Sequence, residues 1–184
     1  PENLKFSNKN QNLKRNYENA VKRLHSLGIM INGSFVFGLD YDDKDVFKRT
    51  VEWGVKNAIT TSTYHILTPY PGTRLFKRME NDDRIITRNW DLYDTRHVVY
   101  KTRNMTADEI EQGYNWAYKE FYKWSNIFKA SGNHEISKHK LKHFFYTAGW
   151  KKFEPFWNFI IKTRHLNNMT PVLESILSNV RKNK

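Results

Sequence analysis

The chain has 184 residues, of which 39% are hydrophobic and 15% aromatic, and its 31 basic and 19 acidic residues give a formal net charge of +12. The aromatic content excludes an intrinsically disordered chain, and no apolar run is long enough to span a membrane, so we expect a folded cytoplasmic protein. Because the chain has no cysteine, it cannot by itself hold a disulfide, a thiolate zinc site or an iron–sulfur cluster.

The first expected elements alternate between helices and strands. Apolar residues at three- and four-residue steps predict a helix over 17–27, and Gly28 suits its C-terminal cap. Residues 29–38 are apolar and bounded by glycine, which is typical of a strand buried on both faces of a parallel sheet. A helix over 46–55 and a strand over 61–68 follow. This order predicts parallel strands joined by crossover helices.

Capping residues mark the starts of the later helices. Asp42 or Asp43 is expected to cap the helix that begins near residue 46, and Thr73 suits the start of another. Residues 97–100 are a candidate third strand. A capping box at 106–109 then opens a helix whose apolar face continues to residue 128, about six turns in all.

The C-terminal region, residues 129–184, holds eleven basic and three acidic residues. A Ser/Gly/Asn stretch over 129–134 is typical of a linker, and three shorter helices are expected beyond it. The lysines of this region alternate with aromatic residues, a pattern that suits contact with nucleic-acid phosphates and bases. Alternatively, the aromatic residues form the core of a small helical unit and the lysines face solvent. The helical spacing of the aromatic residues favours this second interpretation.

Candidate binding features gather around residues 33–38. Glycine in a strand allows a ligand or another backbone to approach, and Gly38 lies at the carboxyl end, where α/β proteins bind ligands. Tight packing or a bulge is the alternative. The acidic stretch 40–45 begins like a calcium loop but lacks the loop's glycine and final glutamate, so a solvated capping loop is favoured.

Histidine offers two further candidates. His65 lies inside the second expected strand without a second ligand at a suitable spacing, which favours a hydrogen-bonded core histidine. His134, His139 and His143 can share one side of a helix, but a zinc ion there would also need Glu135. We therefore expect no metal ligand, and we identify no catalytic residue.

Several segments in the same order resemble one enzyme family. Residues 24–40, 64–76, 104–110 and 113–124 are similar to the later part of radical S-adenosylmethionine (radical SAM) enzymes, most of all to the branch with a cobalamin-binding domain. The resemblance implies an α/β fold, namely the C-terminal portion of a partial (β/α)6 TIM-type barrel followed by a mainly helical extension. It divides the chain into the barrel part (1–103), the helical extension (104–128) and a basic helical tail (129–184).

The resemblance also implies a function. Such an enzyme cleaves S-adenosylmethionine reductively on a four-iron, four-sulfur cluster and then performs radical chemistry or cobalamin-assisted methyl transfer. The expected partners are a missing N-terminal part that would hold the cluster and a small-molecule substrate, with neither nucleic acid nor a membrane span. The chain would then be an inactive fragment of an oxidoreductase or methyltransferase that holds none of these cofactors alone. A basic nucleic-acid-binding module and a helical interaction scaffold are the alternative functions.

Seven residues are expected beside the cofactor because they match the family's motifs. The glycine-bearing strand would border S-adenosylmethionine, and the end of the next strand would contact its adenine region. They are Gly33, Phe35, Val36, Gly38, Ile66, Leu67 and Thr68. Asp40 matches the family's acidic position only loosely and receives no role.

Overall fold

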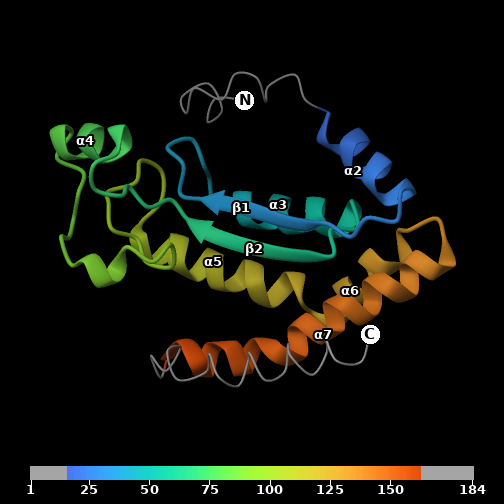
Figure 1. Ribbon diagram of the computed structural model, residues 1–184. Coiled ribbons are helices and arrows are strands. Elements are labelled where there is room, and N and C mark those ends of the chain that lie inside the picture. The colour runs from blue at the N-terminus through green and yellow to red at the C-terminus, as the bar shows by residue number, and fades with distance from the viewer. Residues whose placement is uncertain (1–15, 163–184) are drawn as a thin grey trace. The chain divides into compact units, whose positions relative to one another are not determined.

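The computed structural model describes the backbone of residues 16–162 and the side chains of residues 16–151 (Figure 1). The chain divides into two compact units, residues 1–147 and 148–184, and the fold below is that of the first unit. The last of the three helices expected near the C-terminus lies outside the described residues. No helix in the described range is both long and apolar enough to cross a bilayer. The cytoplasmic location and the division at residues 103 and 128 stay predictions.

Helices and strands alternate through the first half of the described chain, and helices form most of the rest. The elements are, in order, α2 (Tyr17–Ser26), β1 (Asn32–Phe37), α3 (Val46–Lys56), β2 (Thr61–Ile66), α4 (Arg74–Asn81), the 3-10 helix η2 (Trp90–Leu92), α5 (Ala107–Phe121), α6 (Trp124–Gly132) and α7 (Ser137–Lys162). The predicted helices and strands up to β2 are confirmed in type and order.

Two caps confirm predicted helix starts. The Thr106 hydroxyl accepts from the N–H of Glu109, and the Glu109 carboxylate accepts from the N–H of Thr106, which completes the capping box of α5. At the start of α4, the Thr73 hydroxyl accepts from the N–H of Phe76 at 3.1 Å. Both side chains satisfy amide groups that have no partner inside the helix.

Before α7, the helical part differs from prediction at two places. The expected six-turn helix is interrupted at Tyr122 and Lys123, so that α5 and α6 are separate helices. The stretch expected to begin a linker, residues 129–132, forms the last part of α6 instead. The apolar spacing continues across the interruption because both helices pack against α3, so spacing alone did not locate the break.

β1 and β2 form a two-stranded parallel sheet, as the order of elements predicts. Phe37 lies opposite Ile66 where the two strands end. The candidate third strand at 97–100 is wrong, because Tyr100 forms only an isolated antiparallel bridge with Ile85. The partial (β/α)6 barrel is also wrong: the described residues form a small α/β unit in which no further strand pairs beside β1 or β2 to continue a barrel wall.

Helices cover one face of this sheet. In Figure 1, α3 lies behind β1 and α5 runs below β2, and each helix contacts its strand. The Tyr64 ring stacks between Phe35 and Phe37, with ring centres 5.8 and 5.3 Å away. Gly113 of α5 lets α3 approach closely, since a Cβ there would overlap the Phe47 ring. The core is therefore an aromatic layer between the sheet and the α3–α5 pair.

Two tyrosine hydroxyls close the outer edge of β2. The Tyr122 hydroxyl accepts from the N–H of Ser62 and donates to the Ser62 carbonyl, at 3.0 Å each. The Tyr118 hydroxyl does the same at Tyr64, at 3.1 and 3.4 Å. Four residues of helix rise about 6 Å and two residues of strand about 6.6 Å, so hydroxyls one turn apart match alternate strand residues. The pair thus takes the place of a neighbouring strand.

Replacing both hydroxyls should be costly. We expect Tyr118→Phe and Tyr122→Phe each to lower the free energy of unfolding by about 1–3 kcal/mol, because each leaves one backbone N–H and one C=O without a partner. Urea unfolding followed by circular dichroism measures the loss. Tyr146→Phe, at an exposed position on α7, is the matched control and should change stability by less than about 0.5 kcal/mol. A double variant as stable as this control would contradict the edge-closing role.

Candidate functional site

The carboxyl ends of β1 and β2 lie side by side, since the N–H of Leu67 donates to the carbonyl of Phe37 at 2.9 Å. β1 then turns at Gly38, whose φ of +86° favours glycine. A Cβ on Gly38 would lie 2.6 Å from the hydroxyl oxygen of Tyr100, which donates to the Gly38 carbonyl. The backbone turn and the packing of Tyr100 are sufficient to explain this glycine.

The loop after β1 is held by backbone contacts of its own carboxylate. The Asp42 carboxylate accepts from the N–H groups of Gly38 and Leu39 at 3.0 Å each. From a distant part of the chain, the Asn104 side chain donates to the carbonyls of Asp40 and Asp42 at 3.1 and 3.2 Å. These bonds fix the path of the chain where β1 ends.

The helix cap expected from Asp42 or Asp43 is wrong. α3 begins after Asp45, whose side chain makes no capping bond. The Asp43 carboxylate accepts from the N–H of Asp45 and pairs with Arg49 at 2.8 Å. The hydrogen bond from Arg49 lowers the pKa of Asp43. The prediction of a solvated loop is correct for Asp43, which is exposed, but wrong for Asp42, which is buried.

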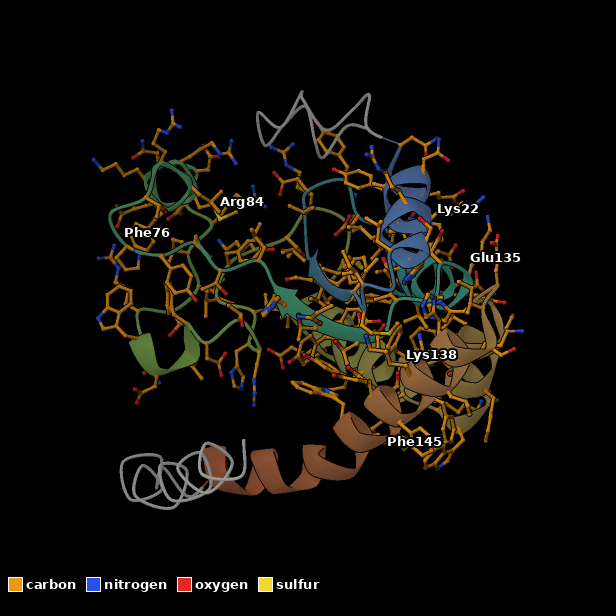
Figure 2. All side chains as sticks on the ribbon, turned by 45° about the vertical axis from the view of Figure 1, so that its right-hand side comes forward. Lys22, Phe76, Arg84, Glu135, Lys138 and Phe145 are labelled. Atoms are coloured by element: carbon orange, nitrogen blue, oxygen red, sulfur yellow. The ribbon has the colours of Figure 1, made fainter. Side chains whose placement is uncertain are left out.

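Asp40 forms a buried ion pair at the end of β1. Its carboxylate side chain, 2% exposed, accepts from the Arg84 guanidinium at 2.5 and 3.1 Å, and Arg103 approaches to 3.4 Å. Arg84 also donates to the Lys101 carbonyl at 2.8 Å and lies 5.8 Å from the centre of the Tyr100 ring. The bond to Asp40 raises the pKa of Arg84. Figure 2 shows Arg84 between α4 and the strands.

Sequence reasoning gave Asp40 no role and did not single out Arg84. The two residues are 44 positions apart, and no spacing pattern connects them. The available signal was the position of Asp40 just beyond the end of the first expected strand. The structure makes this pair the anchor of the loop at the candidate site.

The second face of the sheet is polar, and it is uncovered within the described part of the chain. The strand expected to be buried on both faces is therefore buried on one, although parallel sheets are normally covered on both. The Thr61 hydroxyl donates to the Asn32 side chain at 3.0 Å, and the Nδ1 atom of His65 lies 3.2 Å from the Thr95 hydroxyl. We call this surface the open face; it comprises Asn32, Ser34, Val36, Thr61, Thr63 and His65.

The seven residues expected at a cofactor do not share one surface. Three belong to the helix-covered face, where they contact core side chains: Gly33, Phe35 and Ile66. Val36 lies on the open face, opposite His65. Beyond β2, Leu67 packs against a second apolar cluster, and the Thr68 hydroxyl donates to the Ile66 carbonyl. Gly38 contributes a turn. The structure brings together the strand ends rather than the seven side chains.

Four histidines meet near the start of α7. The Nε2 atom of His134 and the Nδ1 atom of His143 are 2.9 Å apart, and the ring centres of His25 and His139 lie 4.5 and 6.3 Å from that of His134. Burial lowers the pKa of His134 to about 4 and that of His143 to about 3. Within residues 16–151, no three or more His, Asp or Glu side chains are arranged to hold a metal. The His134–His143 pair is a buried structural contact.

A cleft of about 700 Å³ lies on the helix-covered side, away from the strand ends. It is lined mainly by α3, α5 and α6, including Trp53, Trp116 and Asn126. We favour the strand ends over this cleft as the candidate binding site, because ligands of α/β proteins bind at the carboxyl ends of parallel strands.

The chain is similar to curated methyltransferases. It is 36% identical over 129 residues to bacteriochlorophyllide d C-12(1)-methyltransferase of Chlorobaculum tepidum, covering 70% of this chain and 28% of that protein. An uncharacterized methyltransferase of Pyrococcus horikoshii is 32% identical over 103 residues, or 56% of this chain and 22% of its own length. Bacteriochlorophyllide d C-8(2)-methyltransferase of Chlorobaculum tepidum is 26% identical over 111 residues, or 60% and 25%.

The chain spans about a quarter of the length of these relatives. No protein-family model matches it.

These relatives correct the expected function. They are named for methyl transfer, and none of the three names indicates radical chemistry, an iron–sulfur cluster or cobalamin. The assignment to radical SAM enzymes is therefore replaced by a relation to methyltransferases, and the cluster and cobalamin are dropped with it. Neither the nucleic-acid-binding module nor the interaction scaffold gains support. The relation to enzymes stands.

Proposed function

We propose that this chain is part of a methyltransferase that uses S-adenosylmethionine, and that the carboxyl ends of β1 and β2, with the open face, form one wall of its site. Two observations support the proposal. The relatives are methyltransferases, and the open face reaches the strand ends, where α/β proteins bind their ligands. When bound, S-adenosylmethionine supplies the methyl group from its sulfonium.

The residues present fit a ligand of this kind. The exposed Val36 side chain gives an apolar contact for a flat base, and Ser34, Thr63 and His65 beside it offer hydroxyl and imidazole groups. Binding sites typically combine an apolar surface with a few such polar groups. The backbone at Gly38 and Leu67 lies at the same edge of the sheet.

The contribution of this wall is to position the ligand. The Asp42 bonds and the Asp40–Arg84 ion pair hold the β1 end in one conformation before any ligand arrives. A group transfer is accelerated when donor and acceptor are held in reacting geometry, so a rigid strand end favours the reaction.

Titration of the isotopically labelled chain with S-adenosylmethionine tests the proposal. We expect the largest chemical-shift changes at the amides of Val36, Gly38 and Leu67 and at the His65 ring. Val36→Lys should weaken binding about tenfold, because its ammonium repels the sulfonium and crowds the open face. Ile86→Lys, at a similarly exposed position away from this face, should change binding less than about twofold. Shifts confined to the cleft beside Trp53, or equal effects of both lysines, would overturn the proposal.

A further inference from the structure

A continuous aromatic surface lies on α6 and the first part of α7. Phe128 and Phe144 are stacked with ring centres 5.1 Å apart, and Trp124 lies 6.4 and 6.3 Å from them. Phe145 packs against Phe144 at 5.7 Å, and Leu141 lies one turn earlier on the same helix. Trp124 is 49% exposed, Phe128 and Leu141 61%, and Phe145 67%. We call these five residues the aromatic patch. Large apolar patches of this kind mark interaction sites.

Lysines flank the aromatic patch. Lys123 and Lys129 adjoin its α6 residues, and Lys138 and Lys142 accompany its α7 residues; all four are exposed. Lys123 also pairs with Glu120 at 3.7 Å, and Lys142 donates to the Gly28 carbonyl at 3.2 Å. Between residues 120 and 151, the acidic residues of the sequence are Glu120 and Glu135, against six lysines. Figure 2 shows Lys138 and Phe145 along α7, with Glu135 just before this helix. The patch is therefore apolar at its centre and positively charged around it.

We propose that the aromatic patch binds the surface of an anionic lipid bilayer. Aromatic side chains prefer the headgroup region, where their rings are shielded from water, and lysines near the surface are attracted to anionic lipids. The two requirements are met by the same stretch of α6 and α7. The patch would lie on the bilayer and would not span it.

Charge argues against two other binding partners for the aromatic patch, namely a second copy of the chain and its own C-terminal segment. A second copy of this chain also carries +12, so pairing the two patches would bring lysines together. Residues 163–184 of the same chain contain four basic residues and one acidic residue, so that segment does not complement the patch either. Like charges at close range oppose association, whereas an anionic surface offsets them.

Ring geometry favours a bilayer surface over a nucleic acid as the ligand of the aromatic patch. Base stacking requires a free aromatic face, usually within a basic groove. Here Phe128 and Phe144 already stack on each other. Three clefts of about 700, 490 and 200 Å³ in the described part of the chain are all lined by other residues. An apolar surface outside these clefts suits the interface of a lipid bilayer better than it suits individual nucleic-acid bases.

Sedimentation of the full chain with lipid vesicles tests this proposal. We expect binding to vesicles of phosphatidylcholine with about 30% phosphatidylglycerol to be at least tenfold stronger than to phosphatidylcholine alone. Raising the salt from about 0.1 M to about 1 M shortens the screening length from about 10 to about 3 Å and should weaken the binding. The absence of binding to either vesicle, or equal binding to both, would overturn the proposal.

A pair of substitutions locates the contact. Phe128→Ser combined with Phe145→Ser should weaken binding to the anionic vesicles by about tenfold or more. Tyr70→Ser combined with Ile86→Ser removes two similarly exposed apolar side chains elsewhere and should leave binding within about twofold. Equal losses from the two pairs would contradict the assignment to the aromatic patch.

Charge reversal tests the same surface without disturbing the rings. Lys123→Glu combined with Lys138→Glu should weaken vesicle binding at low salt by about tenfold, and circular dichroism verifies that the variant is folded. A single-stranded oligonucleotide serves as the competing ligand. If it binds more tightly than the vesicles, and if that binding depends on Phe128 and Phe145, the patch is a nucleic-acid surface and the bilayer proposal is overturned.

Discussion

Asp40→Ala is expected to lower the free energy of unfolding by about 3–5 kcal/mol, one of the largest losses for a single substitution in this chain. The Asp40 side chain is 2% exposed and that of Arg84 is 11% exposed. Removing the carboxylate leaves the guanidinium buried without its counter-charge, and this uncompensated charge causes the loss. Urea unfolding followed by circular dichroism provides the measurement.

The same loop supplies the matched control. Asp43 also pairs with an arginine, but both side chains of the Asp43–Arg49 pair are more than half exposed. Exposed ion pairs contribute little to stability, so Asp43→Ala should lower the free energy of unfolding by less than about 1 kcal/mol. Adding Arg84→Met to Asp40→Ala should recover part of the loss, because the unpaired charge is then gone. If Asp40→Ala costs no more than Asp43→Ala, the ion pair does not anchor the loop.

Acid is expected to destabilise the chain well before its carboxylates are protonated. His134 and His143 have pKa values of about 4 and about 3 when folded, against an ordinary value near 6.5. Below pH 6.5 the unfolded chain therefore binds protons that the folded chain does not. Stability is full above about pH 6.5 and falls by up to about 1.4 kcal/mol per pH unit for each histidine as the pH drops toward these folded values. His25, His139 and Lys140 lie near His134, and their positive charges help burial to lower its pKa.

Urea unfolding at pH 7, 6 and 5 measures this slope. His143→Asn keeps an amide near the Nδ1 position but removes one titrating group, so the slope between pH 6 and 5 should fall by about half. His97→Asn, beside the exposed Asp94, leaves the buried pair intact and should keep the full slope. If the free energy of unfolding of the parent and of His143→Asn changes equally with pH, this histidine does not cause the loss of stability in acid.

Local signals carried most of the correct fold predictions. The Thr106–Glu109 box and Gly28, with its φ of +74°, are decided by groups within one turn. Parallel pairing follows from the order of helices and strands. The break between α5 and α6 was missed because the core-facing side of both helices is apolar. α7 was expected as separate helices, yet it runs unbroken through Gly149, since a single glycine weakens a helix without ending it.

The candidate site was less predictable because its contacts join distant residues. Tyr118 and Tyr122 meet strand residues 54 and 60 positions away, and nothing in their spacing distinguishes a hydroxyl at a strand edge from a ring in the core. The side chains of the seven expected cofactor residues lie on different surfaces for a simpler reason. Successive strand side chains point to opposite faces, so the side chains of each of the two strand motifs are divided between the two faces of the sheet.

The hydroxyl pair over β2 also determines where a further strand can join the sheet. Strand addition needs free backbone groups along an edge, and those of Ser62 and Tyr64 are already engaged. Ile31 and Phe37 turn their carbonyls toward β2, so Ser34 and Val36, at alternate positions, direct their backbone groups to the opposite side of β1. Within the part of the chain that the structure describes, a further strand can therefore extend this sheet only beside β1.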